Sequence, residues 1–127
     1  MNLRHGWLIL AMFVWASTAQ TSSAAIARYR YVPDETGQLR FQSGERVSVL
    51  GRCILTQPPQ PTCWQRFCHA FTNQWICVPL ALPEGVPQIF HRRDRIIYDY
   101  STYTVQVVFV ADGSVMVVYN SGLLRGV

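Results

Sequence analysis

Lysine is absent from this chain of 127 residues, and charged residues of any kind make up only 14% of it. Arginine therefore carries all the positive side-chain charge. Removal of Arg4 with an N-terminal signal would leave ten arginines against seven acids. Such a modest excess favours no nucleic-acid partner. The Asn-x-Ser/Thr acceptor is also missing from the sequence, so N-glycosylation is not expected.

The residue sets of common enzymes are missing as well. No Ser/His/Asp set, phosphate-binding loop or pair of carboxylates stands out. Cys68 and His69 are adjacent, and adjacent residues on a strand point to opposite faces, so they do not form a nucleophile and its base. Cys63, Cys68, His69 and Cys77 form a loose set of zinc donors, but the thiols of an exported chain usually oxidise. We therefore predict a non-enzymatic protein without metal or cofactor.

No apolar run in the sequence reaches the length that a membrane span requires. The positive start at Arg4 precedes an apolar run over residues 7–15, and small residues follow it. This order predicts a signal peptide over residues 1–19, with the cut as late as residue 25 as an alternative. The other apolar stretch, residues 105–119, is interrupted by an Asp-Gly pair. About 20 apolar residues are needed to span a bilayer, so we expect a secreted or periplasmic chain without an integral span.

No segment has a sustained helical period with caps, whereas strand patterns recur. Residues 44–51 (GERVSVLG) alternate, and residues 63–71 and 74–82 are aromatic-rich runs around a Thr-Asn-Gln turn. Residues 55–63 contain three prolines, which remove ladder donors and predict a loop. These patterns predict an all-β protein.

Residues 96–122 are predicted to form a C-terminal β-hairpin. The pair Asp112-Gly113 favours a two-residue turn with positive φ at both positions, which would place Phe109 opposite Met116. Both faces of this hairpin are apolar, so we expect it to pack on the rest of the domain or on another chain. An unpaired edge of the hairpin would be a site of self-association. The preceding residues 84–95 are interpreted as a solvated basic linker whose patch is formed by Arg92, Arg93 and Arg95.

The stretch ARYRYVPDETGQLRFQSGERVSVL, residues 27–50, resembles the start of an SH3 domain. Its ARYRY stands where the family has its ALYDY signature, and the Leu-x-Phe and Gly-Glu pairs follow at the family's offsets. Trp64 resembles the groove tryptophan of the family, and Pro79 resembles its late proline. The resemblance covers residues 26–83 and implies a small SH3-like barrel. It also implies a groove for polyproline II peptides lined by Tyr29, Tyr31, Trp64 and Pro79.

Gln38 stands where the SH3 family has an acidic residue that pairs with a ligand arginine. Asp34 and Glu35 lie earlier in the same loop and are the candidates to replace it. Leu82 stands where the family has a tyrosine hydroxyl. The resemblance therefore implies the barrel more strongly than it implies ordinary binding of proline-rich peptides.

The four cysteines, an even number in an exported chain, indicate two disulfides, and the sequence leaves all three pairings open. The SH3 layout would place Cys53 and Cys63 at the neck of the long loop. It would place Cys68 and Cys77 on the two arms of the next hairpin. The resemblance thus implies the pairs Cys53–Cys63 and Cys68–Cys77.

A second resemblance, to an immunoglobulin-like sandwich, uses the whole chain. Trp64 follows Cys53 by eleven residues, as a strand C tryptophan follows a strand B cysteine. Tyr103 resembles the tyrosine corner of strand F, although Val105 stands where the second cysteine should be. This alternative implies a secreted or virus-encoded host-interaction protein. The SH3 resemblance implies an exported protein- or peptide-binding module. Because residues 44–51 resemble bacterial SH3 domains, a periplasmic cell-wall-associated protein is a further alternative.

Overall fold

The computed structural model describes residues 25–121, and these residues form strands and loops. None of them is helical, which confirms the predicted all-β class. None forms a helix long and apolar enough to cross a membrane. The predicted signal peptide, residues 1–19, lies outside the described residues. The strands are β1 (Ala25–Pro33), β2 (Leu39–Ser48), β3 (Gly51–Leu55), β4 (Cys63–Cys68), β5 (Trp75–Leu80), β6 (Gln88–His91), β7 (Arg95–Asp99), β8 (Tyr103–Phe109) and β9 (Val115–Ser121).

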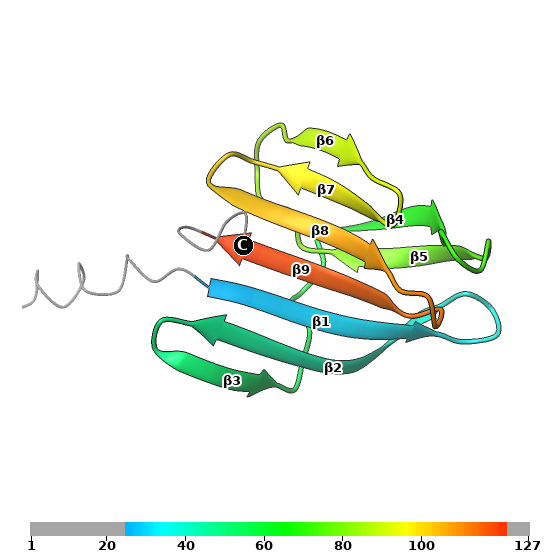
Figure 1. Cartoon of the computed structure of the whole chain (residues 1–127), viewed down its shortest axis with the longest axis horizontal. Helices are drawn as coiled ribbons and strands as arrows, with labels where there is room; N and C mark the ends of the chain where they lie inside the picture. Colours follow the sequence, from blue (N-terminus) through cyan, green and yellow to red (C-terminus); the bar gives the residue numbers. More distant parts are fainter. Residues whose placement is uncertain (1–24, 122–127) are drawn as a thin grey trace, which may run out of the picture.

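Seven of the strands form one antiparallel sheet in the order β3-β2-β1-β9-β8-β7-β6. The hairpin of β4 and β5 forms a separate two-stranded sheet that packs on one face of the large sheet (Figure 1). The first and last described strands, β1 and β9, are neighbours in the middle of the large sheet. This sheet is open, with β3 and β6 at its edges, and the described strands close no barrel. The SH3-like assignment of residues 26–83 stays a prediction.

The division of the chain after residue 83 differs from the expected one. The predicted basic linker, residues 84–95, contains strand β6, which pairs with β7. The predicted C-terminal hairpin is not an appendage, because β8 pairs with β7 and β9 pairs with β1. Both strands of that hairpin therefore have a neighbour on each side. The expectation that its edge would mediate self-association is wrong for this reason, and the free edges belong to β3 and β6.

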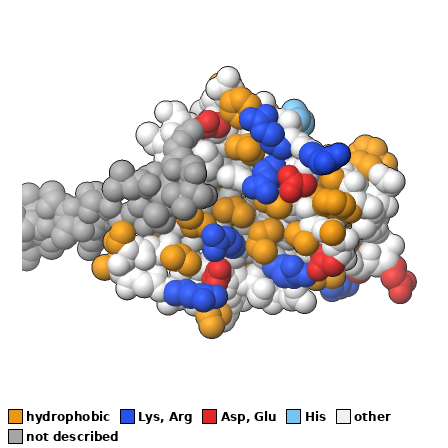
Figure 2. Space-filling model, viewed as in Figure 1, with side chains coloured by type: hydrophobic (Ala, Val, Ile, Leu, Met, Phe, Trp, Pro, Cys, Tyr) orange, Lys and Arg blue, Asp and Glu red, His pale blue; other side chains and the backbone are white. Residues whose placement is uncertain are grey.

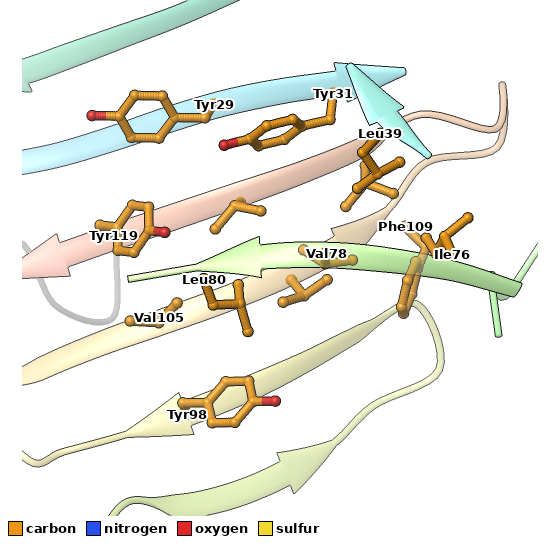
Figure 3. Packing of buried hydrophobic residues seen from close by; sticks show 13 residues of the cluster. Tyr29, Tyr31, Leu39, Ile76, Val78, Leu80, Tyr98, Val105, Phe109 and Tyr119 are labelled. Carbon is orange, nitrogen blue, oxygen red and sulfur yellow. The ribbon is translucent and has the colours of Figure 1, made fainter. Parts of the chain in front are cut away.

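The core lies between the inner face of the large sheet and the β4–β5 hairpin. Alternate residues of β8 and β9 point to this side because successive side chains of a strand face opposite ways. Figure 3 shows the inward side chains of β5 lying over those of the sheet. Burial of this apolar surface is the main favourable term in folding. The buried cluster comprises Tyr29, Tyr31, Leu39, Ile76, Val78, Leu80, Tyr98, Val105, Val107, Phe109, Val115, Val117 and Tyr119.

The turn between β8 and β9 forms where predicted, but its register is shifted by one residue. Phe109 lies opposite Val115 rather than Met116. A three-residue loop replaces the expected two-residue turn, and within it only Gly113 has positive φ, at 94°. This loop avoids the positive φ that the two-residue turn would impose on Asp112. The shift brings Val115 into the core and leaves Met116 on the opposite face.

Asp112 stabilises this turn and links it to strand β1. Its Oδ1 accepts hydrogen bonds from the Ser114 backbone N–H at 2.9 Å and from the Ser114 hydroxyl at 2.6 Å. Its Oδ2 accepts a hydrogen bond from the Arg30 guanidinium of β1 at 2.5 Å. The bonds from Ser114 first, and then the one from Arg30, hold the pKa of the Asp112 carboxyl well below its ordinary value.

We predict that this carboxylate makes the fold acid-sensitive. Because the pKa of Asp112 is lowered on folding, its contribution is complete above the ordinary aspartate pKa of about 3.9 and is lost as the pH falls below it. Asp112→Asn should therefore flatten the pH dependence of the free energy of unfolding below about pH 4. Urea unfolding followed at several pH values measures this slope. Glu35→Gln, a charge removal at an exposed loop position, is the control, and an equal flattening in both variants would contradict the assignment.

Candidate functional site

Tyr29 and Tyr31, two of the four predicted groove residues, belong to the core. Only 8% of Tyr29 and 3% of Tyr31 is exposed. They lie on the inner face of β1, where Tyr31 packs edge-on against Phe41 and Tyr29 packs edge-on against Tyr119. Burial raises the pKa of both hydroxyls. The prediction that they line a ligand groove is wrong, because their faces are covered by the protein itself.

Trp64 and Pro79, the other two predicted residues, lie on the side of the β4–β5 hairpin that faces away from the core. They are opposite each other across the two strands. The strand alternation that turns Ile76, Val78 and Leu80 inward turns their neighbours outward. We call the resulting surface the outer hairpin face. Its residues are Trp64, Arg66, Cys68, Trp75, Cys77 and Pro79.

A depression of about 510 Å³ lies on the outer hairpin face. Trp64 is 57% exposed and Trp75 is 56% exposed, and both line this depression together with Arg66 and Cys77. The guanidinium carbon of Arg66 lies 4.8 Å from the centre of the Trp75 ring, in cation–π contact. Among the described residues, no carboxylate forms an ion pair with Arg66. The depression thus combines two aromatic rings with an arginine whose charge is not neutralised by an ion pair.

The loop between β1 and β2 forms the remaining wall of the depression through Thr36, Gly37 and Gln38. Asp34 fixes this loop, because its Oδ1 accepts hydrogen bonds from the Thr36 hydroxyl at 2.7 Å and from the backbone N–H groups of Thr36 and Gln38 at 2.9 and 3.1 Å. The bond from the Thr36 hydroxyl is the largest cause of the lowered pKa of Asp34. Asp34 is therefore a turn-forming residue, while Glu35 beside it is exposed. Neither lines the depression.

Gly37 allows this loop to reach the hairpin. Its φ of +87° lies in the left-handed region, and a Cβ at this position would lie 2.5 Å from the backbone oxygen of Trp75. The next residue, Gln38, forms a β-bridge with Cys77. A side chain at position 37 would both strain the loop and push it away from β5.

Two polar contacts hold the hairpin on the sheet, one at each end. At the tip, His69 is 1% exposed, and its Nδ1 accepts hydrogen bonds from the N–H groups of Phe71 and Thr72 at 3.1 and 3.3 Å. Its Nε2–H consequently donates to the Ser114 carbonyl at 3.1 Å. At the other end, the Tyr119 hydroxyl accepts a hydrogen bond from the Ala81 N–H at 3.0 Å. Burial raises the pKa of Tyr119 to about 12.

The sequence gives little sign of either anchor. His69 stands out only beside Cys68, where it suggests metal or thiol chemistry instead. Tyr119 is one aromatic residue in a long apolar strand. Among the described residues, no group of three or more His, Cys, Asp or Glu side chains is placed to hold a metal ion.

All four cysteines, Cys53, Cys63, Cys68 and Cys77, carry free thiols in the structure, so neither implied disulfide is formed. Cys68 faces Trp75, two residues before Cys77, so the two thiols are diagonal across the hairpin. Diagonal positions are about 7–8 Å apart, which exceeds the usual Cα separation of a disulfide. Cys53 and Cys63 belong to strands of different sheets.

The predicted basic patch lies at the turn between β6 and β7, and none of its arginines lines the depression. Arg95 pairs with Asp94 at 3.2 Å and donates to Gln106 at 3.2 Å. The guanidinium carbon of Arg92 lies 5.2 Å from the centre of the Phe90 ring. Arg93 lies between them in the turn and is exposed.

Neither a family model, nor a curated protein, nor a solved structure matches this chain. The candidate site is therefore assigned on the geometry of the outer hairpin face.

We expect Gly37→Ala to disrupt the wall of the depression. The added Cβ would meet the Trp75 backbone oxygen, so the loop must move and the tryptophan fluorescence should change. Gly51→Ala is the matched control, since Gly51 also has positive φ but would place its Cβ in open space. Both variants bear the cost of the backbone conformation, roughly 1 kcal/mol, and only Gly37→Ala bears the clash. Equal losses of unfolding free energy and unchanged fluorescence in both would count against this packing.

Proposed function

We propose that this chain is an exported, non-enzymatic protein-binding module that holds an extended peptide segment on the outer hairpin face. The observation that carries the proposal is the pair of half-exposed tryptophans beside an arginine at one depression. Tryptophan and arginine are the side chains most enriched at binding hot spots. A depression of about 510 Å³ is within the range of ligand pockets.

The spacing of the two rings supports an extended ligand. Trp64 faces Pro79 and Trp75 faces Cys68, so the two tryptophans are four residue positions apart along the hairpin. At about 3.3 Å per residue this corresponds to roughly 13 Å. An extended peptide rises by the same amount, so its residues i and i+4 would each meet one ring.

The charge of the site supports an acidic residue within that peptide. Arg66 lies between the two tryptophans in the strand register, opposite Cys77. Its guanidinium is already positioned by the Trp75 ring, which reduces the entropy lost when it pairs with a carboxylate. We therefore propose a peptide ligand with an acidic side chain between two apolar ones.

Export of the module rests on the sequence of residues 1–19, with its positive start, apolar run and small residues. A secreted or periplasmic location would bring the site to extracellular or envelope partners. The thiols would then meet an oxidising environment.

The proposal is tested by titrating the protein with a synthetic extended peptide in which a glutamate lies between two apolar residues, following tryptophan fluorescence. We expect Trp64→Ala and Trp75→Ala each to weaken binding by about tenfold or more, as loss of about 1.4 kcal/mol or more at a hot spot implies. Phe71→Ala is the aromatic control, because Phe71 is also half exposed but does not line the depression.

A second arm tests the role of Arg66. Replacing the glutamate of the peptide by glutamine should weaken binding to the native protein, and Arg66→Gln should abolish that difference. If the native protein and the two tryptophan variants respond alike to the peptide, the proposed site is refuted.

A further inference from the structure

The two edges of the large sheet are protected to different degrees. Proteins block exposed strand edges with proline, charged side chains or bulges, because an open edge pairs with other strands. The β6 edge has such blocks, since Pro87 precedes the strand and Arg92 and Arg93 follow it. Figure 2 shows basic and acidic side chains interspersed with hydrophobic ones on the face of the protein viewed there.

The β3 edge has neither a proline nor a bulge. Its sequence is Gly-Arg-Cys-Ile-Leu, without proline, and its pairing with β2 shows no bulge. Ile54 is 79% exposed, and Val49 and Leu50 in the preceding turn are also exposed. A side of β3 is thus left without a strand neighbour among the described residues.

The single charge on β3 is partly offset by an acidic residue of β2. Arg52 is its sole charged residue, and its guanidinium pairs at 2.5 Å with Glu45 of β2, which also pairs with Arg28. The remaining positive charge lies on guanidinium groups that are partly or largely exposed, and salt screens it. The aliphatic stem of Arg52 remains able to cover an apolar side chain.

We propose that β3 is the self-association edge of this protein, at which two copies pair antiparallel about a two-fold axis at Cys53. This register places Arg52 of one copy beside Ile54 of the other and Gly51 beside Leu55. The two sheets become one continuous sheet, and the exposed Ile54 is partly covered in both copies. A two-fold arrangement is the commonest form of homo-oligomer and closes without further growth.

The central residue of the paired strands, Cys53, can join the two copies by an intermolecular disulfide. Cys53 is exposed and carries a free thiol. Residues directly opposite in an antiparallel pair have Cα atoms about 4.5–5.5 Å apart, within the range of a disulfide. A five-residue strand pair alone buries less than the roughly 1,200 Å² of a stable interface. The noncovalent dimer is accordingly weak, and the intermolecular disulfide stabilises it.

The oxidation proceeds by thiol–disulfide exchange with a small disulfide such as oxidised glutathione. The Cys53 thiolate of one copy attacks that disulfide and releases one thiol, which forms a mixed disulfide. The Cys53 thiolate of the second copy then attacks the protein sulfur and releases the second thiol. Two protein thiols lose two electrons and two protons, and the small disulfide is reduced to two thiols.

The test uses full chains that retain a single cysteine, exposed to oxidised glutathione and followed by non-reducing electrophoresis. One chain retains Cys53, and the control chain retains Cys68 of the hairpin, which is also exposed, with serine at the other positions. The Cys53 chain should form covalent dimer at least about tenfold faster than the control, since edge pairing raises the effective concentration of its thiols. Equal rates would overturn the proposal.

A second variant separates edge pairing from simple thiol exposure. Ile54→Lys in the Cys53 chain leaves the thiol in place and puts the new lysine beside Arg52 of the other copy, so that like charges meet at the paired edge. Because Ile54 is exposed, the fold should tolerate lysine at this position. The dimerisation rate should fall to near that of the control. An unchanged rate, with circular dichroism showing an intact fold, would show that Cys53 reacts by random collision and would refute the paired edge.

Discussion

The pairing of β1 with β9 is the constraint on which the rest of the structure depends. It runs from Ala25 opposite Ser121 to Tyr31 opposite Val115, and it joins strands from the two ends of the described chain. Without it, β1–β3 and β6–β9 would be two separate small sheets. With it, they form one inner face broad enough to bury Ile76, Val78 and Leu80 of the hairpin. Nonlocal pairing of this kind costs loop-closure entropy before its contacts form.

The outer hairpin face follows from that packing. Because one side of β5 is buried, its alternate side chains face solvent. The buried core residues and the exposed tryptophans therefore both result from strand alternation in the hairpin. His69 and Tyr119 fix the hairpin at its ends, and the bridge from Gln38 to Cys77 fixes the loop beside it. The site is therefore presented on a supported surface, which limits the ordering entropy lost on binding.

Local patterns were enough to predict the all-β class, the proline-rich loop and the turn at Gly113, but not strand β6, which was assigned to a basic linker. They were not enough for the β1–β9 pairing, because no short-range signal specifies which distant strands meet. The turn register was missed by one residue, because an Asp-Gly pair suits both a two-residue turn and a three-residue loop. Tyr29 and Tyr31 were assigned to a groove, although a period of two cannot tell which face will be covered. Trp64, assigned to the same groove, is exposed on the hairpin instead of lying beside these tyrosines.

The dependence of the fold on the β1–β9 pairing is tested most directly by the folding of a chain that ends at Glu84. Such a chain retains every residue of the predicted barrel, 26–83, but lacks β6 to β9. We expect it to show no cooperative thermal unfolding transition, because β1 loses its partner and the hairpin loses the inner sheet face. A truncated chain that unfolds cooperatively with native-like near-ultraviolet circular dichroism would contradict this dependence on β9, and would favour an independent SH3-like barrel.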